Sequence, residues 1–488
     1  MADPATGATS AMSVAPYWEV TFDADGDVDG GQRDRLLAGA VHNGVRDLVV
    51  FAHGWNNDRS GATALYSRFF APFPRLAPAA RLGYVGVVWP SMRFSDEPIP
   101  DLPRSSVAAG TARRPALDED TRNALLVTFP GRAALVEPIA RQLELRPSGD
   151  AGLEEFGRLV RLLVEVGPSA PQELCAADVL SEGAVQDTPV MLCGPTAEVC
   201  EDFARALALL EGGSGSVGFS MPNPWDGAHE LLRQAAYYAM KRRAGTVGER
   251  GLGPLLGRLA GAAPHLRVHL VGHSFGGRLV SFALRGLPEG VRAVKSVTLL
   301  QGAFSHYAFA ARLPHDARAG GALSGLQSRV DGPLVCCHSR HDSALGTIYP
   351  LASRMAGDER GAAGEPGTEG EPGTVGRPAA AEVVAGAGVT EAVAGAGTAV
   401  EPGFGGEFGF GGVSGAKWGA MGYGGLRAVP GTRACTLAEA LAAPLPASGC
   451  VNVDVAAVVR RGGPPSGAHS DIVHPELARL VLSAGRVH

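Results

Sequence analysis

Short runs of uninterrupted apolar residues alternate with helical periodicity from residue 48 onward. LVVFA at 48–52 and YVGVVW at 84–89 have no polar face. The segment between these runs places its large apolar residues on one side of a helix, namely Ala62, Leu65, Tyr66, Phe69 and Phe70. This strand-helix-strand order is typical of a parallel sheet with helices on both faces. The pattern therefore predicts an α/β fold with a mostly parallel central sheet.

The same alternation returns in the second half of the chain. A long helix is expected from about Asp226, and another directly after the strand at 267–271. The last helix is expected to begin at Pro475 and to end before Gly485. The later buried strands are predicted at 267–271, 296–300, 333–337 and 451–455.

The N-terminal segment has a period of two instead. Trp18, Val20 and Phe22 alternate with polar residues before an Asp-Gly turn. This arrangement predicts a strand that enters a hairpin.

The same segment imitates the start of a calcium-binding loop, with aspartates at 23, 25 and 27. Such a loop needs glycine at its sixth position and glutamate at its twelfth. The chain has Val28 and Asp34 at these positions, so no metal site is predicted there.

Two stretches interrupt the α/β pattern. Residues 92–225 open with a Pro-rich segment and predict helices around 131–145, 151–166 and 197–211. Because this insertion leaves from the carboxyl end of a strand, it is a candidate lid, and residues 1–91 and 226–488 form the predicted core domain. Residues 356–412 are short imperfect repeats with few large apolar residues, which predicts a flexible Gly-rich loop within that core domain.

Composition narrows the class of protein. The chain has 488 residues, 45% apolar and 19% charged, with a formal net charge of -6. This charge makes nucleic acid an unexpected partner. The N-terminus resembles no secretory signal, and no run reaches the roughly 18 apolar residues of a transmembrane segment. A cytoplasmic protein is therefore expected.

Cysteine usage points away from disulfides and metals. The seven cysteines are scattered and include no CxxC pair, so buried free thiols are expected, with no metal and no cofactor. They lie at positions 175, 193, 200, 336, 337, 435 and 450.

The run VHLVGHSFGGRLV at 268–280 carries the candidate chemistry. Gly272, Ser274 and Gly276 form the pattern G-x-S-x-G, with His273 before the serine. Glycine accounts for 68 of the 488 residues, so the pattern alone is weak. Its position between a buried strand and a helix is the stronger signal, because a sharp strand-to-helix turn exposes a nucleophilic hydroxyl at a helix N-terminus.

In these residues the sequence resembles the α/β-hydrolase superfamily, whose nucleophile lies on this kind of turn. The resemblance covers about 48–91, 226–348 and 449–485. It implies an acid after a later strand and then a histidine near the end of the chain. A serine nucleophile argues against the related haloalkane dehalogenases and epoxide hydrolases, which use aspartate.

A serine hydroxyl needs a histidine to take its proton. His469 is preferred, because it lies in a loop between the last strand and the last helix. His474 remains the rival, although it directly precedes Pro475 and is expected to cap that helix. His488 is the final residue and is not favoured, and Asp471 is interpreted as a local hydrogen-bonding residue.

The histidine in turn needs a carboxylate. Asp342 follows the strand at 333–337, which is where the resemblance implies the acid. His338 and His341 are interpreted as loop residues that lie close enough to tune it. Three other aspartates remain as alternatives: Asp316 and Asp331 precede that strand, and Asp454 lies within a strand.

The resemblance also implies two backbone N–H groups that stabilise the negative oxygen of the intermediate. One is that of Phe275, the residue after the nucleophile. The other follows the strand at 48–52 and the His53-Gly54 pair, which makes it the N–H of Trp55. The next two residues, Asn56 and Asn57, are interpreted as turn formers.

The sequence therefore predicts a serine hydrolase, of the esterase or lipase type, that acts on a small-molecule ester or related acyl substrate. Ser274 would be acylated, His469 would transfer protons and Asp342 would orient the histidine. An alternative hypothesis is a protein that keeps this fold for binding or as a scaffold, with an idle triad.

Overall fold

The computed structural model describes residues 12–55, 57–92, 94, 117–165, 177–180, 192, 194–211, 223–350, 419–463 and 466–488. The predicted Gly-rich loop at 356–412 and Asn56 lie outside these residues. The described residues of the sheet and of the insertion belong to one compact unit.

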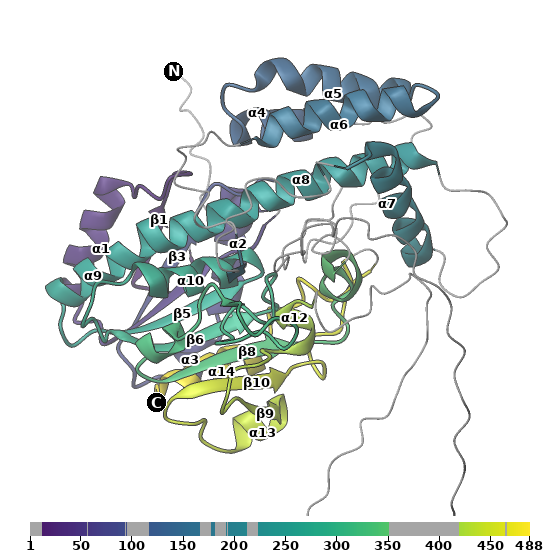
Figure 1. The fold of residues 1–488 in the computed structure, drawn as a ribbon. Coiled ribbons are helices and arrows are strands. Elements are labelled where there is room, and N and C mark those ends of the chain that lie inside the picture. The colour runs from purple at the N-terminus through teal and green to yellow at the C-terminus, as the bar shows by residue number, and fades with distance from the viewer. Residues whose placement is uncertain are drawn as a thin grey trace, which may run out of the picture. The chain divides into compact units, whose positions relative to one another are not determined.

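An eight-stranded sheet forms the centre of this unit, in the order β1-β3-β2-β5-β6-β8-β10-β9 (Figure 1). All of its strand pairs are parallel. The molecule thus has the predicted α/β architecture, and its sheet is parallel throughout the described residues. The strands are β1 (Tyr17–Thr21), β2 (Asp47–Ala52), β3 (Leu82–Val88), β5 (Arg267–His273), β6 (Val294–Leu300), β8 (Pro333–His338), β9 (Arg433–Thr436) and β10 (Gly449–Asp454).

Apolar residues alternate between the two faces of the sheet. In β2, Leu48 and Val50 belong to a core shared with helices α1 (Gly30–His42), α8 (Pro224–Thr246), α9 (Gly253–Ala262) and α10 (Phe275–Gly286). Val49 and Phe51 pack on the opposite face against α2 (Arg59–Phe70), α13 (Leu437–Ala442) and α14 (Pro475–Gly485). This burial on both faces explains why the strands are uninterrupted apolar runs.

The predicted N-terminal hairpin is wrong. After β1 the chain turns through Asp23–Asp27, makes one antiparallel bridge between Phe22 and Val28, and enters α1 instead of a second strand. β1 itself pairs with β3 in parallel. The Asp23 side chain accepts the N–H groups of Asp25 and Asp27, so this aspartate stabilises the turn.

The described part of the insertion is mostly helical. It contains α4 (Glu119–Thr128), α5 (Ala133–Leu145), α6 (Asp150–Val164) and α7 (Thr196–Glu211), and α5, α6 and α7 pack on α8. Figure 1 shows α8 between the pair α5 and α6 and the sheet, with α7 at the far end of α8. The short strand β4 (Val179–Leu180), which the sequence does not predict, pairs with β7 (Gly320–Gly321) of the core.

The remaining elements are short. They are α3 (Phe73–Leu76), η3 (Val247–Leu252), η4 (Leu326–Arg329), η5 (Ala344–Ile348) and α12 (Met421–Gly424). No helix in the described ranges is long and apolar enough to cross a membrane.

The described cysteines are free thiols. Cys200, Cys336, Cys337 and Cys450 are buried, as the sequence predicts. Cys435 is only partly buried, because it lies on the edge strand β9. Cys175 and Cys193 lie outside the described residues.

Candidate active site

Ser274 lies at the carboxyl end of β5, immediately before α10. Its φ of 55° and ψ of -120° place a non-glycine residue in a strained backbone conformation. Such strain persists only where the surroundings fix it, which here are a central strand and a buried helix. The turn presents the serine hydroxyl beyond the end of the sheet.

The glycines of the motif permit close backbone contacts at this turn. A Cβ on Gly272 would collide with the Gly276 carbonyl, and one on Gly276 would collide with the Ala52 carbonyl at the end of β2. A Cβ on Gly54 would lie 2.8 Å from Ser274 Cβ and 3.0 Å from His273 Nδ1. The loop after β2 therefore passes directly over the serine.

Three side chains from separate strand ends meet at this point. His469 Nε2 lies 2.9 Å from Ser274 Oγ, and His469 Nδ1 lies 2.7 Å from Asp342 Oδ2. Asp342 is fully buried after β8, whereas the His469 side chain, in the loop between β10 and α14, is 16% exposed. An ionised carboxylate only accepts hydrogen bonds, so Nδ1 carries the proton and Nε2 accepts the serine hydroxyl.

The surroundings of Asp342 include residues that the sequence interpretation missed. The Leu345 N–H donates to its Oδ1 at 3.0 Å, and Gln301 Nε2 lies 3.5 Å from its Oδ2. Gln301 has a φ of 48° and also donates to the Gly422 carbonyl at 3.2 Å. The one sequence signal for a role of Gln301 beside Asp342 is its position directly after a buried strand.

Two backbone N–H groups are available beside the serine. That of Phe275 is the first in α10 and has no partner within the helix, where the helix dipole favours negative charge. That of Trp55 follows Gly54 and has no partner among the described residues. The Trp55 and Phe275 rings have their centroids 6.3 Å apart, so the two residues that carry the predicted donors are neighbours in space.

His53 holds the loop that carries Trp55. Its ring stacks on Trp89 at 5.5 Å, its carbonyl accepts the Trp89 indole N–H at 2.9 Å, and its Nδ1 bonds the Gly54 carbonyl at 2.8 Å. Burial lowers the pKa of His53 to about 4, so the ring is neutral at pH 7. Asn57 donates to the Gly54 and Trp55 carbonyls, which fits its interpretation as a turn former.

His273, interpreted from the sequence only as part of the motif, contacts the loop of His469. Its Nε2–H donates to the His469 carbonyl at 2.9 Å. Burial, with a smaller repulsion from His469, lowers the pKa of His273 to about 3, so this donor is a neutral imidazole.

The alternative acids and bases lie in other contacts. His474 bonds Asp471 at 2.8 Å, and Asp471 also accepts the N–H groups of Arg460 and Arg461.

Asp454 accepts the Ala456 N–H at the end of β10. His338 is partly buried at the end of β8 and bonds the Tyr423 backbone, and burial lowers its pKa. Asp316 accepts the Arg318 N–H, Asp331 pairs with Lys295, and His341 N–H donates to Ser339.

A second Ser-His-Asp arrangement lies nearer the amino ends of the strands. His269 Nδ1 is 2.9 Å from Ser296 Oγ, and His269 Nε2 is 3.0 Å from Asp47 Oδ1. All three side chains are buried, and Ser296 lies within β6, opposite His269 and next to a shift in the pairing register, rather than before a helix. Within the described part of the chain no helix begins at Ser296, so this arrangement links β2, β5 and β6 without the features of a catalytic turn.

Comparisons with protein-family models, with curated proteins and with solved structures give no match. The geometry of the site therefore carries the functional argument.

Proposed function

We propose that this protein is a serine hydrolase of the α/β-hydrolase type that cleaves a carboxylic ester or a related acyl bond. The observation that carries the proposal is the continuous hydrogen-bond path from Asp342 through His469 to the hydroxyl of Ser274. The other parts that acyl transfer requires are the strained turn at Ser274 and the N–H groups of Phe275 and Trp55, for which the described residues supply no acceptor.

In the first half-reaction, Ser274 Oγ attacks the acyl carbon while its proton moves to His469 Nε2. The carbonyl oxygen becomes negative and accepts hydrogen bonds from Phe275 and Trp55. Asp342 accepts Nδ1–H and stabilises the imidazolium. When the intermediate collapses, the bond to the leaving oxygen breaks and His469 returns its proton to that oxygen.

In the second half-reaction, water replaces the alcohol. His469 takes a proton from this water as its oxygen bonds to the acyl carbon, and then gives the proton to Ser274 Oγ as the acyl-serine bond breaks. The products are the free acid and the original enzyme, and no cofactor takes part in these steps.

A serine-directed fluorophosphonate tests this proposal. Its phosphorus is attacked only by a serine that a neighbouring base activates, so we expect labelling of the wild type and none of Ser274→Ala. Absence of labelling in folded wild-type protein would favour the alternative, a binding or scaffold protein with an idle triad.

A further inference from the structure

Asp178 is a buried carboxylate that belongs to the insertion, outside the triad. It lies directly before β4, in the described stretch 177–180 between α6 and α7. Its side chain is 1% exposed. A charge this deeply buried must be paired to be tolerated, so its partners show what the insertion is attached to.

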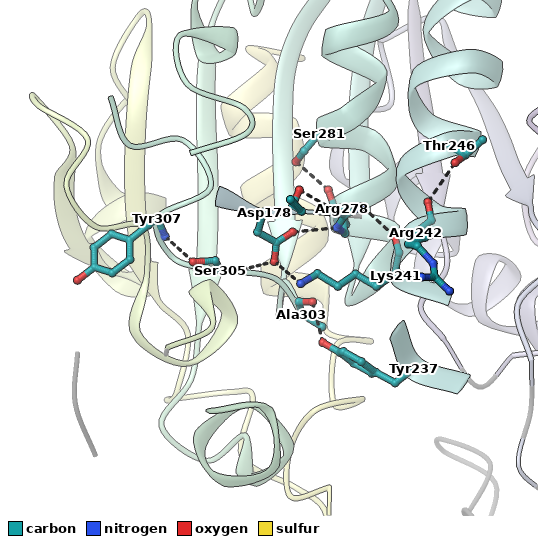
Figure 2. Close-up of polar contacts among 12 residues, drawn as sticks. Asp178, Tyr237, Lys241, Arg242, Thr246, Arg278, Ser281, Ala303, Ser305 and Tyr307 are labelled. Carbon is teal, nitrogen blue, oxygen red and sulfur yellow. Dashed lines mark hydrogen bonds and ion pairs between the residues drawn. The ribbon is translucent and has the colours of Figure 1, made fainter. Parts of the chain in front are cut away.

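The partners of Asp178 come from the core (Figure 2). Lys241 Nζ on α8 lies 2.9 Å from Oδ2, and Arg278 Nε on α10 lies 3.0 Å from Oδ1. Both cationic side chains are 0% exposed. The Ser305 N–H donates to Oδ2 at 3.0 Å, and the Tyr349 hydroxyl lies 3.4 Å from the same atom.

Arg278 fixes the geometry of this cluster. Besides Asp178, its guanidinium donates to the Lys241 carbonyl at 2.8 Å and to the Ala177 carbonyl at 3.2 Å. One side chain on α10 thereby joins the insertion to α8. Burial alone would raise the pKa of Asp178, but Lys241, Arg278 and the Ser305 N–H together outweigh burial and lower the pKa, so the carboxylate is charged.

These partners belong to the elements that form the candidate site. Arg278 lies one helical turn after Ser274 on α10. The loop of Ser305 also carries Ala303, whose N–H donates to the Ser274 carbonyl at 3.4 Å. On α8, Tyr237 packs on the Phe275 ring at 4.5 Å and donates to the Ala303 carbonyl at 3.2 Å (Figure 2).

The two residues after Lys241 attach further segments of the insertion. Arg242 donates to the carbonyl of Val164, the last residue of α6. Arg243 donates to the carbonyl of Thr128, the last residue of α4, and to that of Pro90 just after β3. Both arginines are buried, so opening the insertion as a hinged lid would break their hydrogen bonds to the Val164 and Thr128 carbonyls.

We infer that Asp178 is a positioning residue: it fastens the insertion to α10 through Arg278 and thereby holds the first turn of α10, with Ser274 and Phe275, in place. The insertion then acts as a fixed wall of the site at this point and not as a lid that opens. The effect on catalysis rests on the proposed function, whereas the effect on α10 does not.

The test compares Asp178→Asn with Asp226→Asn in the full chain. Asp226 also pairs with an insertion residue, Arg146, but its side chain is 55% exposed, so it is a matched control for a surface ion pair.

We expect D178N to increase amide hydrogen exchange in residues 275–286 by about tenfold or more. We also expect kcat for p-nitrophenyl acetate to fall about tenfold with KM within about twofold, because positioning acts on the reacting geometry. D226N should match the wild type in both.

The inference would be overturned if D178N had the amide exchange and the kcat of the wild type. It would also be overturned if D178N had a higher kcat and a lower KM than the wild type, because that is the behaviour expected of a lid that has opened. If D178N does not fold, Asp178→Asn with Lys241→Met restores the net charge of the buried cluster. This double variant should fold and still show fast exchange in α10, and wild-type exchange would overturn the inference. The wild type could lack esterase activity while D178N still exchanges its α10 amides faster than the wild type. That result would refute the proposed function and leave the inference about Asp178 intact.

Discussion

The side chain of His273 donates a hydrogen bond to the carbonyl oxygen of His469 across 2.9 Å. The residue before the proposed nucleophile therefore holds the loop of the proposed base. Because His469 reaches Ser274 and Asp342 from a loop rather than from a helix or strand, this bond fixes the loop where the proton must move.

Replacing His273 with leucine should lower kcat about tenfold or more, because it removes this donor and leaves the His469 carbonyl unpaired. His273→Gln keeps an N–H donor on a side chain of comparable length and should recover most of the rate. Steady-state kinetics with p-nitrophenyl acetate measures both. A leucine variant as active as the wild type would show that the loop needs no such support.

His469→Ala should lower kcat/KM by about 10³-fold or more, because the serine then has no base. His474→Ala is the matched control, since His474 bonds Asp471 beside α14, and its kcat/KM should stay within about threefold of wild type. A residual rate near wild type in H469A would assign the proton transfer to another group.

Gly54→Ala should abolish most activity, because the new Cβ would lie 2.8 Å from Ser274 Cβ and would displace the Trp55 N–H from the site. Gly261→Ala is the control: it lies in α9 with no atom within 4 Å of a new Cβ. G261A should keep wild-type kinetics and gain about 0.5 kcal/mol of stability. Equal activity of both variants would remove the Gly54 loop from the mechanism.

Buried histidines should make the protein less stable in acid. Burial lowers the pKa of His53 to about 4 and that of His273 to about 3, below the ordinary value of 6.5. Between pH 6.5 and about 4 the unfolded chain therefore binds protons that the folded protein does not. As the pH is lowered through this range, the free energy of unfolding decreases by about 1.4 kcal/mol per pH unit for each histidine. Above about pH 7 these two residues contribute no slope.

Urea denaturation at several pH values measures this slope. His273→Gln removes one of the two groups and should flatten the dependence, whereas replacement of the exposed His265 by glutamine should not. A wild-type stability that is constant from pH 7 to pH 5 would contradict the burial of neutral histidines.

The sequence predicts much of the sheet because its central strands are buried on both faces. The strands around Val50, Val85 and Leu270 are recognisable as apolar runs without knowledge of their neighbours. The strand at Tyr17–Thr21 could also be predicted, but its partner could not. Its period of two and the Asp-Gly turn are the local signals of a hairpin, but its pairing with β3 depends on residues far along the chain.

The same division holds for the site. Ser274, Asp342 and His469 could be predicted because each follows a recognisable strand and because the resemblance implies their order along the chain. The contacts of His273, Gln301 and Asp178 could not, because each joins residues from distant segments and leaves no local pattern.

Labelling with a fluorophosphonate, followed by mass spectrometry of the modified peptide, tests the central claim most directly. Ser296 provides the control, because it also bonds a histidine that bonds an aspartate, yet it is fully buried. We predict a single adduct on Ser274, retained in Ser296→Ala and lost in Ser274→Ala. Folded wild-type protein without an adduct, or equal labelling of S274A, would contradict the assignment of Ser274 as the nucleophile.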